Sequence, residues 1–396
     1  GIPIPALYCD ACGETFYADS FLARVEELVR REGIEGYWRA DAADLAAGES
    51  CPRCGAHAWS KSTDILDVWF ESGSSHLAVL LHRPGHRWPA DLYLEGSDQH
   101  RGWFQLSLLI ALCTMGDAPF RAVLTHGFML DAAGKAMHKS AGNTIPPQDV
   151  VQKYGADVLR LWVASEDYRN DIRLSYQLLD QVAETYRRIR NTCRFMLGNL
   201  GDFDPGRDAL PEDAWTELDR YAYGRFKALA ARVVRAYEDL EFHIIYHNVH
   251  NFCAVTLSAF YLDVLKDRLY CEAARGKERR AAQSCLYLIT QGLAQLLAPI
   301  LPFTAEEIWR HLPAETGRPA SVHLTEWDFP TPSTQEEVLQ EKFAHLLEIR
   351  DVVFKALEEA RAAGKIGHPL EARVILEAAG EDLALLKKEH TSLPSL

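Results

Sequence analysis

The chain has 396 residues, 48% hydrophobic and 25% charged, which is the composition of an ordinary globular protein with room for two or three domains. Its formal net charge of −14 excludes a general nucleic-acid coat protein, which is basic overall, but allows a local basic surface that docks one folded RNA. No apolar run reaches the length of a membrane span and the first residues do not form a signal peptide, so we predict a cytoplasmic protein with no membrane partner.

Two CxxC pairs, each followed by a glycine, lie within residues 1–62. A two-residue spacer lets both thiolates of a pair reach one ion, and two pairs complete a tetrahedral zinc site. A redox dithiol is the alternative, but redox pairs occur singly at the start of a helix. Four thiolates leave no open position for chemistry, so we predict a structural Zn²⁺ ion. The predicted ligands are Cys9, Cys12, Cys51 and Cys54, with a helix over residues 21–31 between the pairs.

The next part of the chain alternates between short apolar runs and one long apolar helix. Residues 64–73 form an apolar run closed by a polar turn, which predicts a strand that ends at a pocket. Residues 91–95 predict a buried strand, residues 101–115 a helix and residues 122–127 another strand. Strand, helix and strand in close succession predict a right-handed crossover in a parallel sheet.

Polar residues follow both of these strands. Ligands of parallel sheets bind beyond the carboxyl ends of the strands, and a helix N-terminus at this edge favours anionic groups. In an alternative interpretation Asp98 is the N-cap of the helix, and Gln99 and His100 are ordinary residues of its first turn. The Asp98 carboxylate is able both to cap the helix and to bind a ligand. The residues predicted to line this edge are Glu95, Gly96, Asp98 and Gln99 after the first strand, and His126 and Gly127 after the second.

A short cationic stretch follows the second strand. We call residues 134–143 (GKAMHKSAGN) the lysine loop. Ammonium groups, a serine hydroxyl and backbone N–H groups on a glycine-flanked loop make a clamp for phosphate oxygens. A solvated surface turn is the alternative, because short strings of this composition are common. The polar edge beside it favours the clamp, and we predict that Glu95 and Lys139 face each other across one nucleotide-sized gap.

Beyond residue 175 the apolar spacing is almost entirely helical and predicts a bundle. The first of these helices carries a basic stripe, which on its own is usually a solvated face. The stripe consists of Arg187, Arg188, Arg190 and Arg194. Helices are predicted over residues 178–200, 218–240, 242–268, 278–297, 304–311 and 335–363, and a turn over residues 364–369 leads to a strand over residues 372–376.

Three motifs together resemble the isoleucyl-tRNA synthetases, which are class I aminoacyl-tRNA synthetases. They are residues 64–73 (DILDVWFESG), residues 96–104 (GSDQHRGWF) and the lysine loop, which corresponds to the KMSKS signature. The second motif distinguishes the isoleucine enzymes from their valine and leucine relatives. The resemblance runs from residue 1 to about residue 377. The loop departs from the signature, since Ala136 and His138 replace its first lysine and first serine, whereas Lys139 and Ser140 match it.

The resemblance implies an α/β Rossmann-like half-domain with a zinc-bearing insertion, followed by an all-α anticodon-binding helical bundle. It also implies a division of the chain into segments. These are a zinc-knuckle insertion (1–62), the second half of the catalytic domain (63–165), a stem-contact linker (166–185), the anticodon-binding domain (186–332) and a truncated C-terminal junction (333–396).

The implied chemistry is the ATP-dependent activation of L-isoleucine and its transfer to tRNA(Ile). In-line transfer at phosphorus needs positioning and charge neutralisation, and Mg²⁺ accompanies ATP. Core packing is an equal alternative for both tryptophans among the implied binding residues. The implied catalytic residues are Lys139 and Ser140; the implied ATP-, adenylate- and isoleucine-binding residues are Glu95, Gly96, Asp98, Gln99, Trp69, Trp103, His126, Gly127, Met137 and Lys139; and the implied tRNA contacts are Arg187, Arg188, Arg190 and Arg194.

The sequence contains no HIGH-type motif and no stretch that resembles the family's editing domain. We therefore expect a C-terminal portion that starts after the editing domain and needs the N-terminal half of the enzyme as a partner. The alternative is a catalytically incomplete tRNA-binding module. Ala136 and His138 in the lysine loop favour the module, whereas Glu95, Asp98 and Lys139 favour the enzyme.

Overall fold

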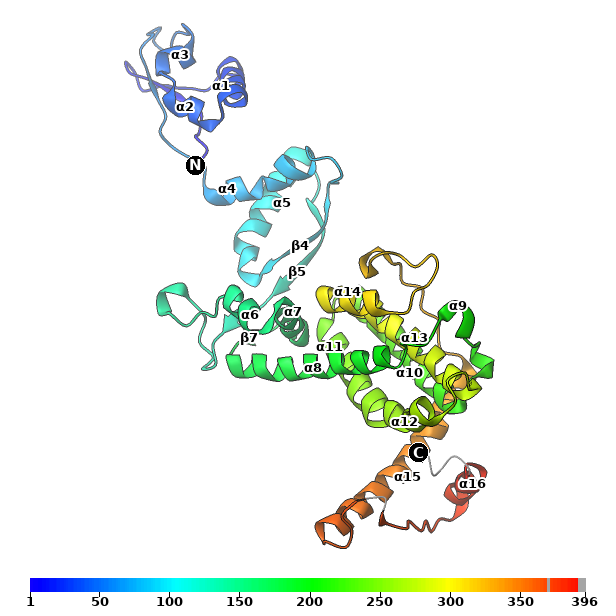
Figure 1. Ribbon diagram of the computed structural model, residues 1–396. Coiled ribbons are helices and arrows are strands. Elements are labelled where there is room, and N and C mark those ends of the chain that lie inside the picture. The colour runs from blue at the N-terminus through cyan, green and yellow to red at the C-terminus, as the bar shows by residue number, and fades with distance from the viewer. Residues whose placement is uncertain (369–370, 391–396) are drawn as a thin grey trace. The chain divides into compact units, whose positions relative to one another are not determined.

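The computed structural model describes residues 1–368 and 371–390, which form two compact units (Figure 1). The first unit spans Gly1–Phe128 and the second spans Met129–Leu396. None of the helices in the described residues combines the length and hydropathy needed to cross a lipid bilayer.

The first unit begins with a small antiparallel sheet and three helices. Strand β1 (Leu7–Cys9) lies in the middle, between β2 (Thr15–Phe16) and β3 (Trp59–Lys61). The helix predicted over residues 21–31 is confirmed as α1 (Asp19–Glu32). Its apolar face packs on the sheet, and Leu7, Phe21 and Tyr37 are fully buried. The other two helices are α2 (Ile34–Arg39) and α3 (Ala42–Ala46).

The rest of the first unit contains the predicted strand–helix–strand segment. Strands β4 (Ala90–Gly96) and β5 (Phe120–His126) are parallel neighbours, with Glu95 opposite Thr125. The turn η2 (Ser97–Arg101) and helix α5 (Trp103–Met115) connect them. Helix α5 packs on β4, where the Trp103 ring stacks on Tyr93 with 4.3 Å between centroids. The predicted parallel arrangement is confirmed.

The prediction of a strand over residues 64–73 is wrong, because part of this segment forms a helix. Helix α4 (Val68–Gly73) follows an isolated bridge between Pro3 and Ile65. The Asp67 carboxylate accepts a 2.8 Å hydrogen bond from the Trp69 N–H and so caps the helix. The short π-helix η1 (His76–Leu80) comes next. The Asp67 carboxylate, two residues before Trp69, therefore begins a helix that the apolar pattern alone does not indicate.

The first predicted strand is present, but it is not buried. Within β4 only Tyr93 and Gly96 are buried, whereas Leu92 is 40% and Leu94 is 53% exposed. Helix α5 is apolar around its circumference, and yet Leu109 is 50% exposed. An evenly apolar helix normally lies inside a protein. The unit therefore presents apolar surface on both its sheet and its helix.

The second unit starts with the lysine loop and two helices. Strand β6 (Met129–Leu130) pairs in parallel with β7 (Ile172–Arg173), and the loop between them contains the short turn η3 (Lys139–Ala141). Helices α6 (Pro147–Tyr154) and α7 (Ala156–Ser165) follow.

The remainder is a helical bundle, as predicted (Figure 1). Its one large core includes Trp309, Tyr261 and Phe226. Helix α8 runs without interruption through residue 185, and the division into five segments stays a prediction. The elements are α8 (Tyr176–Gly198), α9 (Pro205–Asp208), η4 (Glu212–Ala214), α10 (Glu217–Glu238), α11 (Phe242–Asn251), η5 (Phe252–Tyr261), α12 (Leu262–Cys271), α13 (Lys277–Leu297), α14 (Pro302–His311), η6 (Val322–Leu324), α15 (Thr334–Ala362) and α16 (Gly380–Lys388).

Two predictions for the bundle need correction. The single helix predicted over residues 242–268 is interrupted by η5, a π-helical segment of ten residues. The strand predicted over residues 372–376 is absent, since these described residues have no regular structure. The predicted turn ends at Pro369, which lies outside the described residues. Helix α15, which precedes these residues, packs on the bundle. Its Phe343 ring stacks on Tyr221 with 4.4 Å between centroids.

Candidate functional site

The four cysteines of the CxxC pairs meet in one cluster. All four Sγ atoms lie within 4.8 Å of one another, and the Cys9–Cys54 and Cys12–Cys51 pairs are both 3.6 Å apart. Tetrahedral zinc with Zn–S bonds of about 2.3 Å needs sulfurs about 3.8 Å apart, so the geometry fits this ion. The separation is too long for a disulfide, and all four are free thiols. Among the described residues, this is the one group of side chains arranged as metal ligands.

Both pairs are shaped by the same backbone turn. The Gly13 N–H donates to the Cys9 carbonyl and the Gly55 N–H to the Cys51 carbonyl, each at 2.8 Å. The two glycines have φ values of 73° and 75°, a region that disfavours side chains, which explains the glycine after each pair. Burial opposes ionisation of Cys51, but the N–H groups of Cys54 and Arg53 more than offset it and hold the pKa of this thiol at about 7. The same turn therefore shapes both pairs, and its N–H groups stabilise the thiolate form of Cys51.

The polar edge forms where β4 and β5 end. Gly96 lies opposite His126 in the sheet, and a Cβ at Gly96 would lie 2.6 Å from Oδ1 of Asp98. Any side chain at position 96 would thus displace the carboxylate. His126 shares a 2.9 Å hydrogen bond with the Gly127 carbonyl. The sheet therefore brings the predicted residues Glu95, Gly96, Asp98, Gln99, His126 and Gly127 to one edge.

The capping of α5 differs from the alternative considered for Asp98. The Gln99 side-chain oxygen accepts from the Trp103 N–H at 2.9 Å, whereas Asp98 makes no capping hydrogen bond. Asp98 instead accepts from the Gln99 side-chain amide at 3.1 Å. Gln99 is thus the structural member of the pair, and it leaves the exposed Asp98 carboxylate available to a ligand.

The two candidate tryptophans differ in surroundings. Trp103 stacks on Tyr93, and its ring N–H donates to the Ser72 carbonyl at 3.1 Å. Trp69 is 42% exposed and lies against Gly102, where a Cβ would be 3.1 Å from its ring. Core packing accounts for Trp103, whereas Trp69 has a free surface. A role for either in the isoleucine pocket stays a prediction.

The lysine loop is braced at its base by two residues that the sequence did not identify. The Asp131 carboxylate accepts from the N–H groups of Ala133 and Lys135 and from the Asn143 amide, each at 2.9 Å. The Asn143 side-chain oxygen in turn accepts from the His138 N–H at 3.0 Å. The Asn143 amide and the Lys135 N–H hold the pKa of Asp131 below its usual value. An aspartate three residues before a glycine is the turn pattern that predicts such a brace.

The predicted catalytic residues lie in sequence between Asp131 and Asn143, which brace the loop. Lys139 and Ser140 begin the turn η3, with Ser140 exposed; the Lys139 side chain lies outside what the structure describes. Met137 is half-buried and packs against the core of the bundle. Glu95 belongs to the first unit and the loop to the second, so their predicted juxtaposition stays a prediction.

The basic stripe on α8 separates into paired and unpaired arginines. Arg187 pairs with Glu184, and Arg190 pairs with Glu307 at 2.8 Å. Within the described residues no carboxylate lies within ion-pair distance, 4.0 Å, of Arg188 or Arg194. These two guanidinium groups are therefore the members of the stripe available to an anionic partner.

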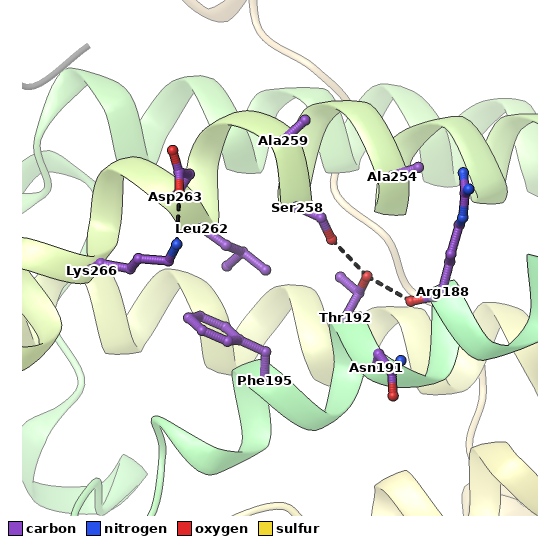
Figure 2. Close-up of a pocket in the computed structure, with 10 residues that line it drawn as sticks. All are labelled: Arg188, Asn191, Thr192, Phe195, Ala254, Ser258, Ala259, Leu262, Asp263 and Lys266. Atoms are coloured by element: carbon purple, nitrogen blue, oxygen red, sulfur yellow. Dashed lines mark hydrogen bonds and ion pairs between the residues drawn. The ribbon is translucent and has the colours of Figure 1, made fainter. Parts of the chain in front are cut away.

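Arg188 stands at one end of a groove of about 640 Å³ (Figure 2). Helix α8 contributes Asn191, Thr192 and Phe195 to one side, and η5 with α12 forms the other. A 2.9 Å hydrogen bond between the hydroxyls of Thr192 and Ser258 joins the two sides. Lys266 lies at the far end, paired with Asp263 at 2.7 Å. The helical pattern gave no indication of this groove, because it did not reveal the π-helical segment.

Two family models match successive parts of the chain. Residues 1–175 match the family model "tRNA synthetases class I (I, L, M and V)", and residues 219–376 match "Anticodon-binding domain of tRNA ligase". The chain is 52% identical over 388 residues to the isoleucine–tRNA ligase of Moorella thermoacetica, covering 98% of this chain and 42% of that protein. It is also 52% identical over 399 residues to that of Syntrophotalea carbinolica, covering 100% of this chain and 43% of the relative.

Solved structures show the same fold. The chain superposes on the LeuRS–tRNA–LeuAMS ternary complex of Agrobacterium radiobacter K84 with a TM-score of 0.57 and 22% identity, over 86% of this chain and 41% of that chain. Mycobacterium tuberculosis methionyl-tRNA synthetase with methionyl-adenylate matches with a TM-score of 0.53 and 17% identity, over 74% of this chain and 60% of that chain. The chain spans about two-fifths of the length of the two isoleucine–tRNA ligases described above.

Proposed function

The chain belongs to the class I aminoacyl-tRNA synthetase family, and we propose that it supplies the adenylate-binding edge, the lysine loop and the tRNA-binding bundle of an isoleucine–tRNA ligase. The observation that carries the proposal is the 52% identity to isoleucine–tRNA ligases along nearly the whole chain. The motif GSDQHRGWF supports the choice of isoleucine. A cytoplasmic location remains the prediction made from the sequence.

In the proposed reaction the carboxylate of isoleucine attacks the α-phosphorus of ATP. A new O–P bond forms, the bond to the β-phosphate oxygen breaks, and pyrophosphate leaves with the electron pair. Lys139 and Ser140 stabilise the negative charge that grows on the departing oxygen. Gly96 lets the adenylate approach the strand end closely, and the Asp98 carboxylate holds the amino group of isoleucine. Mg²⁺ bound to ATP neutralises phosphate charge in this chemistry. A hydroxyl of the 3′-terminal ribose of tRNA then attacks the carbonyl carbon of the adenylate. An ester bond forms, the bond to the phosphate oxygen breaks, and AMP leaves with the electron pair.

The apolar surface of the first unit supports a requirement for more of the catalytic domain. The sheet has two parallel strands, and leucines on both β4 and α5 are exposed. Patches of this kind mark interfaces. The relatives are more than twice as long as the segment that they share with this chain. We propose that further strands from that remaining length cover the leucines and complete the ATP site.

We also propose that the four-cysteine cluster holds one structural Zn²⁺ ion. The purified chain should contain about one equivalent of zinc, and Cys51→Ser should lose it together with slow amide exchange in α1. Cys113→Ser is the matched control, because Cys113 is exposed and lies outside the cluster. Retention of both zinc and protected α1 amides in Cys51→Ser would exclude this role.

The bundle is the proposed tRNA surface. Arg188 and Arg194 would contact backbone phosphates, and the groove beside Arg188 has room for an unstacked base against Phe195. Arg188→Gln should weaken binding of tRNA(Ile) and reduce its salt dependence, since one phosphate contact is lost. Arg187→Gln is the control, because Arg187 already pairs with Glu184.

A catalytically incomplete tRNA-binding module is the second candidate, favoured by Ala136 and His138 in the lysine loop. Isoleucine-dependent exchange of pyrophosphate into ATP separates the two. The chain is mixed with the remaining part of the Moorella thermoacetica enzyme and assayed with and without Lys139→Ala. Exchange that Lys139→Ala abolishes supports the enzyme. Tight tRNA binding with no exchange in any mixture supports the module.

A further inference from the structure

A second and much smaller cavity lies between α10, α11 and the π-helical segment η5. Its volume is about 70 Å³, against about 640 Å³ for the groove of Figure 2. That volume holds a few water molecules or one tetrahedral oxyanion, and it is several times smaller than a typical ligand pocket of about 300–1,000 Å³. The polar residues that line it are Arg225 and Arg232 from α10, Asn248 and Asn251 from α11, and Thr256 from η5.

The cavity carries positive charge without a counter-charge. Arg225 and Arg232 are seven residues apart, so two helical turns place them on one face of α10. In the part of the chain that the structure describes, no carboxylate lies within 4.0 Å of either guanidinium. Arg235, less than one turn further on, does have such a partner in Asp239 at 3.5 Å. Two unpaired arginines at one cavity are notable in a chain with a net charge of −14, and they favour an anionic ligand.

The remaining polar groups position or extend this pair. The Asn248 oxygen accepts from Nη1 of Arg232 at 2.8 Å, and the Asn248 amide donates to the Ile244 carbonyl at 2.7 Å. Asn248 is therefore a positioning residue that fixes the Arg232 side chain. Arg225 and the exposed Asn251 have no hydrogen-bond partner among the described residues, so their N–H groups are free to donate.

Thr256 supplies an independent indication of a ligand. A threonine hydroxyl inside a helix normally donates to the carbonyl four residues earlier, as those of Thr192 and Thr290 do here. Thr256 is only 7% exposed, and its hydroxyl has no such bond within the described residues. The π-helical winding of η5 removes the usual acceptor geometry. The nearly buried hydroxyl lines the cavity instead.

We propose that this cavity is a binding site for one phosphate group. Guanidinium groups match phosphate oxygens with paired hydrogen bonds, and the Thr256 hydroxyl and the Asn251 amide add two neutral donors. The lining contains no carboxylate to repel the anion. The phosphate is either a free anion or part of an RNA backbone, and the second source rests on the proposed function.

The first test measures the binding of inorganic phosphate to the full chain by calorimetry. The wild type should bind one equivalent. Arg225→Gln should bind about tenfold more weakly, since it loses a charge-assisted hydrogen bond, and Thr256→Val should also bind more weakly. Arg235→Gln is the matched control, on the same helix but outside the cavity, and should bind like the wild type. Circular dichroism confirms that each variant is folded. Absence of saturable binding in the wild type, or equal binding by Arg225→Gln, overturns the proposal.

The second test distinguishes the two sources of phosphate. Binding of tRNA(Ile) is measured over a range of salt concentrations for the wild type and for Arg225→Gln/Arg232→Gln. If the ligand is an RNA phosphate, the slope of log affinity against log salt should fall by about one. An unchanged slope together with lost phosphate binding assigns the site to a free anion. Failure of the wild type to bind tRNA contradicts the proposed function alone, because the calorimetric result does not depend on RNA.

Discussion

The attachment of α15 to the bundle depends on a buried cation. Lys227 of α10 donates to Glu336 of α15 at 2.8 Å and to Glu212 at 2.9 Å. The side chains of Lys227 and Glu336 are only 8% and 10% exposed, whereas Glu212 is 44% exposed. Lys227→Met keeps the aliphatic volume but leaves the Glu336 carboxylate without its cation. Removing one member of a buried pair costs about 3–5 kcal/mol.

The expected loss lies at the lower end of that range, about 3 kcal/mol, for two reasons. Glu336 still accepts from the Ser333 N–H at 2.7 Å within the capping box of α15. Glu212 remains largely in water and needs no new partner. Adding Glu336→Gln to Lys227→Met should recover much of the loss, because the neutral amide tolerates burial better than an unpaired carboxylate.

Amide exchange in α15 is the suitable assay, because it reports the opening of this helix rather than global unfolding. Slow amides near Glu336 should exchange roughly a hundredfold faster in Lys227→Met, which corresponds to about 3 kcal/mol. Arg235→Met is the control, since Arg235 is 82% exposed in its pair with Asp239 and should change little. Unchanged exchange in Lys227→Met, or no recovery in the double variant, would refute the reasoning.

Three further predictions concern packing, acid stability and the lysine loop. Gly292→Ala would place a Cβ 2.1 Å from the ring of Phe226, so it should cost at least about 1–3 kcal/mol in chemical denaturation, with partial recovery when Phe226→Leu is added. Hydrogen bonding from Arg279 lowers the pKa of Asp202 from 3.8 to about 2, so its stabilisation is complete above pH 4 and lost toward pH 2. Asp202→Asn should be less stable than the wild type at pH 6 and equal to it at pH 2, and equal stability at both pH values contradicts the prediction. Asp131→Ala should accelerate amide exchange at the base of the lysine loop, and an unchanged rate there would mean that the brace is not needed.

The elements predicted from long periodic segments agree with the structure to within a few residues. Helices α1, α8, α10 and α13 and the parallel pair β4–β5 were all found from apolar spacing. Apolar spacing gave a wrong prediction where a hydrogen bond of one side chain determined the secondary structure. Asp67 starts a helix by accepting a single N–H, and no periodic pattern reports that bond. The π-helical segment keeps an ordinary helical sequence, so its different winding and the cavities beside it became visible only in the structure.

The candidate site was predictable to a different degree in each part. Cysteine pairs with fixed spacing determine a cluster almost independently of the surrounding fold, and all four sulfurs lie together. Motif resemblance named both Asp98 and Gln99 as binding residues, but it did not reveal that Gln99 caps α5 while the Asp98 carboxylate is exposed. That distinction depends on which side-chain oxygen reaches the Trp103 N–H, a matter of a few ångströms. Asp131 lay just outside the recognised motif and was missed for that reason.

The wrong prediction of a buried β4 is informative about the protein itself. Long apolar runs are typical of segments that are buried in the folded protein. The leucines of β4 and α5 lie in runs of this kind. In the first unit Leu92, Leu94 and Leu109 are instead 40%, 53% and 50% exposed. Burying a leucine contributes about 1.5–3 kcal/mol, so surface leucines on a sheet and its helix together represent stabilisation that this unit does not realise alone. The bundle of the second unit shows no such mismatch in α13, where Leu286, Ile289 and Leu293 are fully buried. If the proposed further strands complete an ATP site, they should therefore also stabilise the first unit, and the two effects should appear at the same concentration of the added segment.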